Sequence, residues 1–305
     1  MDTRIIEDWF SPLPEEEKNS EFIALESKTF IQEAWERFRQ NKMALAGLLI
    51  LIFMAVMAIM GPFLSPYEYD AQDTSNAYAV FSSQHLLGTD KFGRDIFVRL
   101  CYGARISLSI GFGAAIINSF IGVVIGGICG YFGGKLDTLI MRIVDIIYAM
   151  PSMIYVILIM MLNGANVESI LIGVCIPGWI GMARQVRGQV IALKEQEFAL
   201  AAMVLGATDK RILFRHLIIN AIGPIIVQMT LLVPSAIFTE AFLSFIGIGI
   251  SAPMASWGSM AQDTRQVMTL HPMQMLLPTI CICLTIFSLN FFGEGIGDAL
   301  NPKKK

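Results

Sequence analysis

Charged side chains are scarce in this sequence of 305 residues, because only 15% of them are Asp, Glu, Lys or Arg. Soluble domains carry about 25%, so the scarcity argues against an ordinary soluble globular protein. Hydrophobic residues make up 55% of the chain. The composition therefore favours a membrane protein.

Clusters of the residues that enzymes and metal sites use are also missing. The three histidines are scattered without an HExxH pattern, and the five cysteines show no CxxC spacing. No GxSxG motif or Ser–Lys pair stands out. We therefore expect no catalytic residue, no metal site and no disulfide framework. Residues 1–27 lack the apolar core of a signal peptide, and we expect none.

A phosphate-binding loop is absent as well. The nearest match to GxxxxGK[ST] is at Gly134 and Lys135, but Cys129 and Leu136 occupy two of the required positions. We therefore expect this chain to bind no cofactor itself. Any ATP-driven process would need ATP and Mg²⁺ on separate partner subunits, and we expect no nucleic-acid partner.

Long runs without charge are what the sequence has instead. A helix needs about 20 mostly apolar residues to cross the hydrocarbon core, and the runs predict six such helices. They are Met43–Tyr67, Ile106–Gly134, Ile146–Val167, Ser169–Ala183, Leu217–Thr239 and Gln266–Gly293. The fourth run is short, and we expect it to extend through Arg184, whose long side chain can reach the interface.

The distribution of positive charge predicts the orientation of these helices. With six spans and the N-terminus inside, five of the 22 Lys and Arg residues fall outside: Lys91, Arg94, Arg99, Arg105 and Arg265. The other 17 fall on the inner side, as the positive-inside rule requires. Both termini are therefore predicted to be cytoplasmic.

The pattern divides the chain into five parts. They are a cytoplasmic segment at residues 1–42, a first transmembrane helix at 43–65, an extracytoplasmic loop at 66–104, a five-helix core at 105–297 that contains a cytoplasmic loop at 184–216, and a cytoplasmic tail at 298–305. We expect residues 28–42 to form an interfacial helix, with Thr29 and Gln32 as its capping box. A cytoplasmic helix packed on protein is the alternative.

The third outer region, residues 241–268, is poor in charge but broken by Gly247, Gly249, Pro253 and Gly258. Irregular backbone at membrane depth is tolerated only when it is buried in protein or lines a water-filled cavity. The pattern therefore predicts a half-inserted loop that roofs a cavity, with a simple extended outer loop as the alternative.

Four glycines recur at intervals of four residues: Gly122, Gly126, Gly130 and Gly134. They lie near one helical face, where the lack of side chains lets another backbone approach closely. The ladder predicts helix packing, either within the chain or against a partner span.

Two acidic residues near span ends are candidates for a functional role. Glu240 lines a translocation path in one interpretation and holds a structural hydrogen bond in the other. Asp145 follows Arg142 by three residues, so we expect the two to pair on the same helix face.

The inner loop carries the most specific pattern in the sequence. Residues 198–205 are good helix formers, and Gly206 suits a left-handed helix stop. Thr208 can cap the next helix. A small apolar helix face of this kind fits into a groove on a soluble partner.

This loop resembles the signature of permeases from binding-protein-dependent ABC importers. The signature reads roughly EAA, three residues, Gly, and an apolar-apolar-Pro ending. Ala201, Ala202 and Gly206 match at the right spacing, whereas Leu200 replaces the Glu and Ile219 replaces the Pro.

The resemblance runs from about Phe30 to Pro302. The segments LGTDKFGRDIFVRLCYGARISL, GWIGMARQVRGQVIALKEQEFALAA, RHLIINAIGP and TEAFLSFIGIGISAPMASWGSMAQD are similar to the C-type subunit of oligopeptide and dipeptide importers. It implies an all-α type I importer permease with six transmembrane helices in the bacterial cytoplasmic membrane. It also implies a coupling helix that docks on an ATPase through Glu197, Ala199, Leu200, Ala201, Ala202, Leu205, Gly206 and Ala207.

The same resemblance implies the partners: a second homologous permease subunit, one or two ABC ATPases, an extracytoplasmic peptide-binding protein, the peptide substrate and membrane lipid. The implied mechanism is alternating access, driven by ATP-dependent closure of the ATPases. We expect oligopeptides as substrate, with dipeptides, glutathione and nickel chelates as alternatives. A self-powered secondary transporter would need an ion relay or inverted repeats, and neither is evident. A membrane-embedded enzyme is the third possibility.

Overall fold

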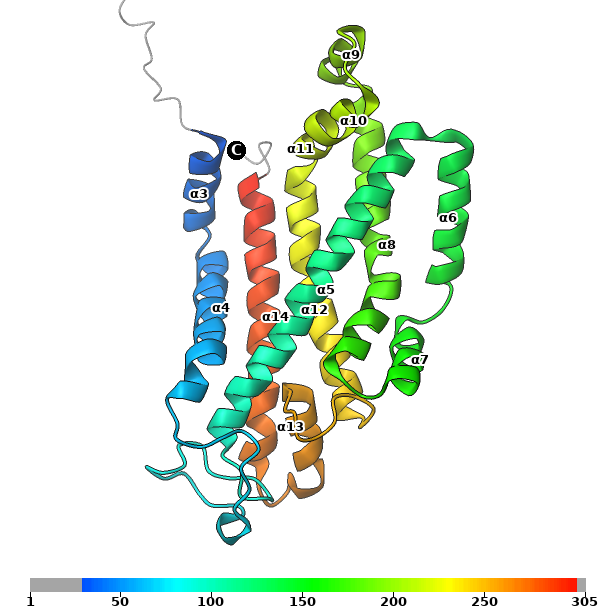
Figure 1. Ribbon diagram of the computed structural model, residues 1–305. Coiled ribbons are helices and arrows are strands. Elements are labelled where there is room, and N and C mark those ends of the chain that lie inside the picture. The colour runs from blue at the N-terminus through cyan, green and yellow to red at the C-terminus, as the bar shows by residue number, and fades with distance from the viewer. Residues whose placement is uncertain (1–28, 301–305) are drawn as a thin grey trace, which may run out of the picture.

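The computed structural model describes residues 29–300, and its regular structure is helical (Figure 1). The helices are α3 (Phe30–Gln40), α4 (Lys42–Met60), α5 (Ile96–Phe132), α6 (Gly134–Tyr148), α7 (Ser152–Asn163), α8 (Val167–Lys194), α9 (Glu197–Val204), α10 (Asp209–Arg211), α11 (Ile218–Asn220), α12 (Ile222–Phe245), α13 (Trp257–Thr264) and α14 (Pro272–Leu300). Short helical turns are η3 (Gly61–Phe63), η4 (Thr74–Asn76), η5 (Ile212–Leu217, a π-helix) and η6 (Arg265–Val267). The predicted segments before residue 29 and after residue 300 lie outside the described residues.

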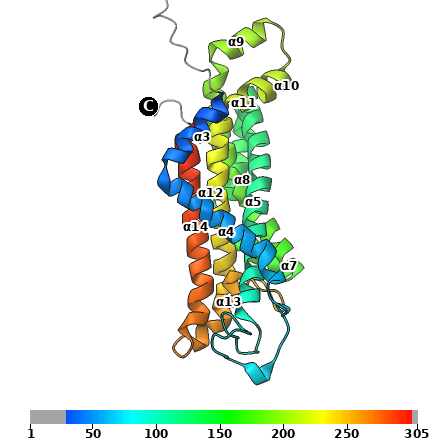
Figure 2. The same cartoon turned by 90° about the vertical axis from the view of Figure 1, so that its left-hand side faces the viewer.

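Five helices are long and apolar enough to cross a membrane: α4 with η3, α5, α8, α12 and α14. The pair α6 and α7 passes the same test together, although it is bent by 76° at the break between them. Counted as one span, the pair brings the total to the six that the sequence predicts. Figures 1 and 2 show these helices side by side in one bundle.

The observed helices differ from the predicted runs at most of their ends: α4 ends at Met60, α8 runs on to Lys194, α12 begins at Ile222 and α14 at Pro272. Two further differences have a clear local cause. α5 begins at Ile96 rather than Ile106, because the Asp95 side chain accepts a hydrogen bond from the Val98 amide at 2.9 Å and caps the first turn. The predicted run Ile146–Val167 is interrupted at Pro151, which has no N–H to continue a helix.

The glycine ladder packs within the chain. A Cβ at Gly122, Gly126 or Gly130 would collide with Met182, the Ala183 backbone or the Arg187 carbonyl of α8. The absence of these side chains therefore lets α5 and α8 approach closely. Gly134 does not belong to the ladder, because α5 ends at Phe132. The backbone of Gly134 has a φ of +59°, and the space around it is open.

The third outer region folds back into the protein instead of extending outward. Ser256 caps α13 with a capping box, and Trp257 is fully buried. The Trp257 indole Nε1 donates to the Leu100 carbonyl of α5 at 3.1 Å. α13 also packs against α12 and α14, so the alternative of a simple extended loop is wrong.

At the other end, α3 begins with the predicted capping box. The Gln32 amide donates to the Thr29 hydroxyl at 3.4 Å, and the Thr29 amide donates to the Gln32 side chain at 2.9 Å. Phe38 is buried against Phe292 of α14, while Ile31 and Trp35 are exposed. The exposed apolar side chains are what an interfacial helix requires.

Candidate functional site

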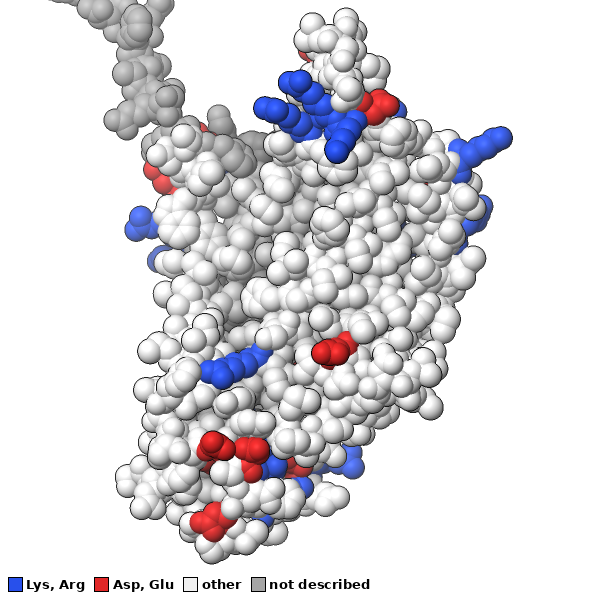
Figure 3. All heavy atoms as spheres, in the orientation of Figure 1, with Lys and Arg blue, Asp and Glu red and all other residues white. Residues whose placement is uncertain are grey.

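The inner loop projects from one end of the bundle. Figures 1 and 2 show α9 standing beyond the ends of α5, α8 and α12, at the same end as α3. On the face shown in Figure 3, Lys and Arg gather beside this projection, whereas the middle of the molecule is almost free of charge. This end is therefore the inner end by the positive-inside rule.

The end of α9 is a Schellman motif. The Gly206 amide donates to the Met203 carbonyl and the Ala207 amide to the Ala202 carbonyl, both at 3.0 Å. Gly206 has a φ of +77°, so the predicted left-handed stop is confirmed. The prediction that the Thr208 side chain caps the next helix is wrong. Thr208 directly precedes α10, but its side chain makes no capping hydrogen bond.

One face of α9 is packed against the bundle. Ala199 is 1% exposed and lies in an apolar cluster with Ile212 and Leu213 of η5, and Ala202 and Ala207 pack against the same cluster. Ala199 therefore anchors α9 to the bundle. This corrects its predicted role as a docking contact.

The other face is apolar and open, and we call it the apolar tip: Leu200, Met203, Val204 and Leu205. Val204 and Leu205 are 87% and 86% exposed, and the other two are about half exposed. Glu197, Ala201 and Gly206 are also exposed. Met203 and Val204 were not among the predicted contacts, although the run Met203–Val204–Leu205 directly before the glycine stop is a signal for them. An exposed apolar cluster on a polar end of a protein marks an interaction site.

Polar contacts at Tyr131 of α5 join the loop after α9 and the end of α8. The Tyr131 hydroxyl of α5 donates to the Asp209 carboxylate at 2.7 Å. The Lys194 ammonium of α8 donates to the Tyr131 carbonyl at 2.6 Å and lies 5.0 Å from the centre of the Tyr131 ring. Tyr131 is therefore the point where the loop after α9, the end of α8 and the end of α5 meet.

Two ion pairs connect α8 with α6 near the same end. Arg187 donates to both oxygens of Asp137 at 2.6 Å, which is the strong bidentate form. Arg184 donates to Asp145 at 2.9 Å. This contact corrects the predicted pairing of Asp145 with Arg142, because the partner lies on a neighbouring helix.

Comparison with known families identifies the class of protein. Residues 122–305 match the model for the inner membrane component of binding-protein-dependent transport systems. Residues 29–81 match the N-terminal transmembrane domain of oligopeptide transport permease C. The chain belongs to the family of binding-protein-dependent transport permeases.

Full-length relatives are similar to this permease. The oligopeptide transport system permease protein OppC of Bacillus subtilis (strain 168) is 47% identical over 294 residues, covering 96% of each chain. The dipeptide transport system permease protein DppC of the same organism is 44% identical over 301 residues, covering 98% of this chain and 94% of the relative. OppC of Escherichia coli (strain K12) is 39% identical over 291 residues, covering 95% and 96%.

A solved structure shares the fold. It is the MetNI methionine ABC transporter in inward-facing conformations, with a TM-score of 0.55 and 17% sequence identity. The match covers 67% of the permease and 96% of the solved chain. The all-α, type I importer fold that the sequence predicts is thereby confirmed.

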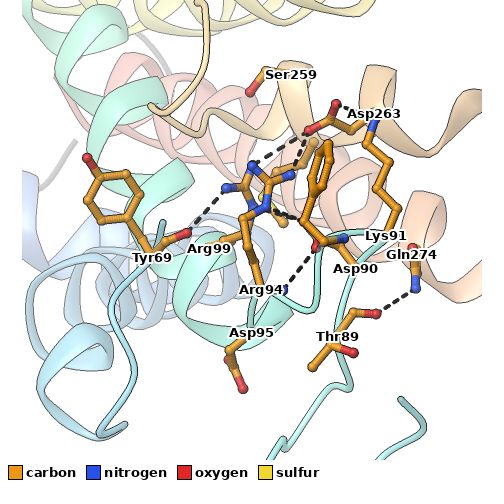
Figure 4. A network of polar contacts seen from close by, with 12 residues as sticks. Tyr69, Thr89, Asp90, Lys91, Arg94, Asp95, Arg99, Ser259, Asp263 and Gln274 are labelled. Carbon is orange, nitrogen blue, oxygen red and sulfur yellow. Dashed lines mark hydrogen bonds and ion pairs between the residues drawn. The ribbon is translucent and has the colours of Figure 1, made fainter. Parts of the chain in front are cut away.

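The outer end of the permease holds a second polar assembly, which we call the outer knot: Asp90, Arg94, Arg99 and Asp263 (Figure 4). Arg94 donates to Asp90 at 2.6 Å and to Asp263 at 3.3 Å. Arg99 lies 3.7 and 3.6 Å from the same two carboxylates. Both arginines are buried, so the knot joins the outer loop, α5 and α13 through charges that neutralise one another.

Glu240 lies inside the permease between α5 and α12. It is fully buried, and its two carboxylate oxygens accept hydrogen bonds from the Ser107 and Ser244 hydroxyls, each at 2.9 Å. These contacts agree with the interpretation in which Glu240 holds a structural hydrogen bond. The placement of Glu240 on a translocation path stays a prediction.

Proposed function

We propose that this permease is one of two transmembrane subunits of an ATP-driven importer for peptides. The apolar tip carries the proposal, because exposed Val204 and Leu205 form a surface that a separate subunit can cover. The relatives named oligopeptide and dipeptide transport permeases support the substrate class. Within this class we propose oligopeptides, with dipeptides as the alternative that the dipeptide permease relative supports.

The partners supply what this chain does not carry. ATP and Mg²⁺ bind to one or two ATPase subunits, which receive α9 in an apolar groove. A homologous second permease completes the pore, and an extracytoplasmic binding protein delivers the peptide. ATP favours one state of the assembly only in so far as it binds that state more tightly.

The inner loop transmits the movement of the ATPases. The loop that carries α9 is bonded to α5 where the Tyr131 hydroxyl donates to Asp209 of α10, and the end of α8 is bonded to the same residue through Lys194. When the ATPases close, these contacts carry the displacement of α9 into both helices. The spans then open outward to accept peptide and return inward after hydrolysis.

Reconstitution of the complete importer in proteoliposomes tests the proposal. We expect uptake of a labelled tetrapeptide that requires ATP and the binding protein, and competition by unlabelled peptides of two to six residues assigns the preferred length. A pull-down of the tagged permease is expected to recover a second permease and ATPase subunits. Uptake by this chain alone, driven by an ion gradient, would overturn the proposal.

A further inference from the structure

A groove of about 480 Å³ lies where α6 and α7 are bent apart. We call it the break groove, and its walls include Tyr148, Pro151 and Ser152 of the break, Gly178 of α8, and Ser235 and Thr239 of α12. Its volume falls in the range of about 300–1,000 Å³ that small-ligand sites occupy. Residues far apart in the sequence therefore build one concave surface.

The wall of the break groove is polar but uncharged. Hydroxyls of Ser152, Ser235 and Thr239 alternate with apolar side chains, and no Asp, Glu, Lys or Arg lines it. The Thr239 hydroxyl donates to the Ser235 carbonyl at 2.8 Å, which leaves its oxygen lone pairs as acceptors. Such a wall offers hydrogen bonds without selecting for charge.

Each of the three walls of the break groove contains a proline. Pro151 lies in the break, Pro177 inside α8 and Pro234 inside α12. Proline has no N–H, so the two helical prolines leave the carbonyls of Gly173 and Thr230 without their usual intrahelical donors. Irregular backbone at membrane depth is tolerated where it is buried in protein or lines a water-filled cavity, and Pro151 and Ser152 at the break are not buried within this chain.

The Asp145–Arg184 ion pair borders the break groove. The Arg184 guanidinium lies 4.6 Å from the centre of the Tyr148 ring, which lines the groove, while its Nη2 donates to Asp145. The two charges cancel each other, so they add no net charge beside the groove.

We propose that the break groove is this subunit's contact surface for the peptide in transit, and that it binds the peptide backbone rather than particular side chains. Each residue of an extended peptide presents one N–H donor and one carbonyl acceptor. The Ser152 and Ser235 hydroxyls can donate and accept, and the Thr239 oxygen can accept. Together they match the backbone groups of any peptide sequence. This inference rests on the proposed function of peptide import.

The first test removes two hydroxyls with little change of shape, in the double variant Ser235→Ala, Thr239→Val. In the reconstituted importer, we expect initial uptake of tetra-alanine and of tetralysine to fall by a similar factor, about three- to tenfold, the scale of one lost hydrogen bond. ATP hydrolysis stimulated by the binding protein is expected to stay within twofold. A loss confined to one of the two peptides would overturn backbone recognition.

Thr279→Val is the matched control. The Thr279 hydroxyl of α14 donates to the Met275 carbonyl at 2.8 Å, so the substitution removes the same kind of bond within a helix, outside the groove walls. We expect uptake like that of the parent. Equal losses in the control and the double variant would contradict the groove assignment.

A second variant narrows the groove. Ser152 is exposed at the start of α7, so Ser152→Trp is accommodated without repacking the core, and we expect it to slow hexapeptides more than dipeptides. If the parent importer takes up peptides but this variant and the double variant both match the parent, the groove inference fails alone. If the parent takes up no peptide, the proposed function fails with it.

Discussion

The apolar tip and the outer knot occupy opposite ends of the molecule and place their side chains in opposite ways. At the inner end, Val204 and Leu205 expose apolar surface to water. At the outer end, Arg94 and Arg99 are buried against Asp90 and Asp263. Each arrangement is costly by itself.

The difference lies in where the compensation comes from. The outer knot is satisfied within the chain, because each buried arginine faces two carboxylates. The apolar tip has no such cover in the described residues, so a partner must supply it. Substitutions in the knot are therefore expected to change stability, and substitutions in the tip are expected to change transport.

The largest effect is expected from Asp90→Ala. Removing one partner from a buried ion pair typically costs about 3–5 kcal/mol, and Asp90 faces both buried arginines. We expect a large drop in the thermal midpoint of the purified permease and in its amount in the membrane. Glu68→Ala, an exposed carboxylate in the same loop, serves as the control. Equal thermal midpoints for Asp90→Ala and Glu68→Ala would show that the outer knot does not stabilise the fold.

Leu205→Asp is expected to reduce uptake at least tenfold while the amount of permease stays constant. A central contact of an interface costs about 2 kcal/mol or more when lost, and the exposed Leu205 side chain makes little contribution to the fold. Leu270→Asp places the same change at the outer end, at a residue that is 77% exposed. Normal ATPase recovery in a pull-down with Leu205→Asp would contradict docking at the apolar tip.

Gly206→Ala is expected to cost about 1–2 kcal/mol, because an L-residue is strained in the left-handed conformation that this position adopts. The space around it is open, so no clash adds to this cost. Gly188→Ala within α8 is the control, because a Cβ at Gly188 also points into open space. Replacing a glycine inside a helix by alanine stabilises the helix by about 0.5–1 kcal/mol. Thermal unfolding of both variants is expected to show shifts of opposite sign.

The smallest effect is expected from Lys91→Ala. Lys91 lies at the rim of the outer knot, 3.2 Å from Asp263 and partly exposed. Ion pairs of this kind contribute about 0–1 kcal/mol and are screened by salt. At low salt, we expect the unfolding free energy of Lys91→Ala to lie slightly below that of the parent. At high salt, we expect the two values to be equal. If Lys91→Ala lowered the unfolding free energy as much as Asp90→Ala, the exposed charge at the rim would contribute as much to stability as the buried charges of the knot.

Features that depend on neighbouring residues could be predicted from the sequence. Charge-free runs indicated the spans because the cost of burying charge acts on each helix separately. The capping box at Thr29 and the stop at Gly206 are also local. These patterns specify backbone geometry within one or two turns.

Features that depend on tertiary packing could not be predicted in this way. Asp145 pairs with Arg184 on another helix, and Asp90 meets Asp263 through buried arginines supplied by the outer loop and α5. Ala199 is buried because η5 folds back beneath α9. The break at Pro151 was missed because the charged residues of α6 excluded that helix from the apolar run.

α5 has a mechanical consequence of its own. Its 37 residues form one continuous helix, about 55 Å long, that runs from the outer knot at Arg99 to the inner anchor at Tyr131 (Figure 1). The helix is held by the ion pairs of Arg99 at its outer end and by the Tyr131–Asp209 hydrogen bond at its inner end. A tilt of about 5° about its outer end moves its inner end by about 5 Å over that length. Under the proposed function, a small tilt of α5 is therefore enough to follow a displacement of the loop that Asp209 bonds to Tyr131.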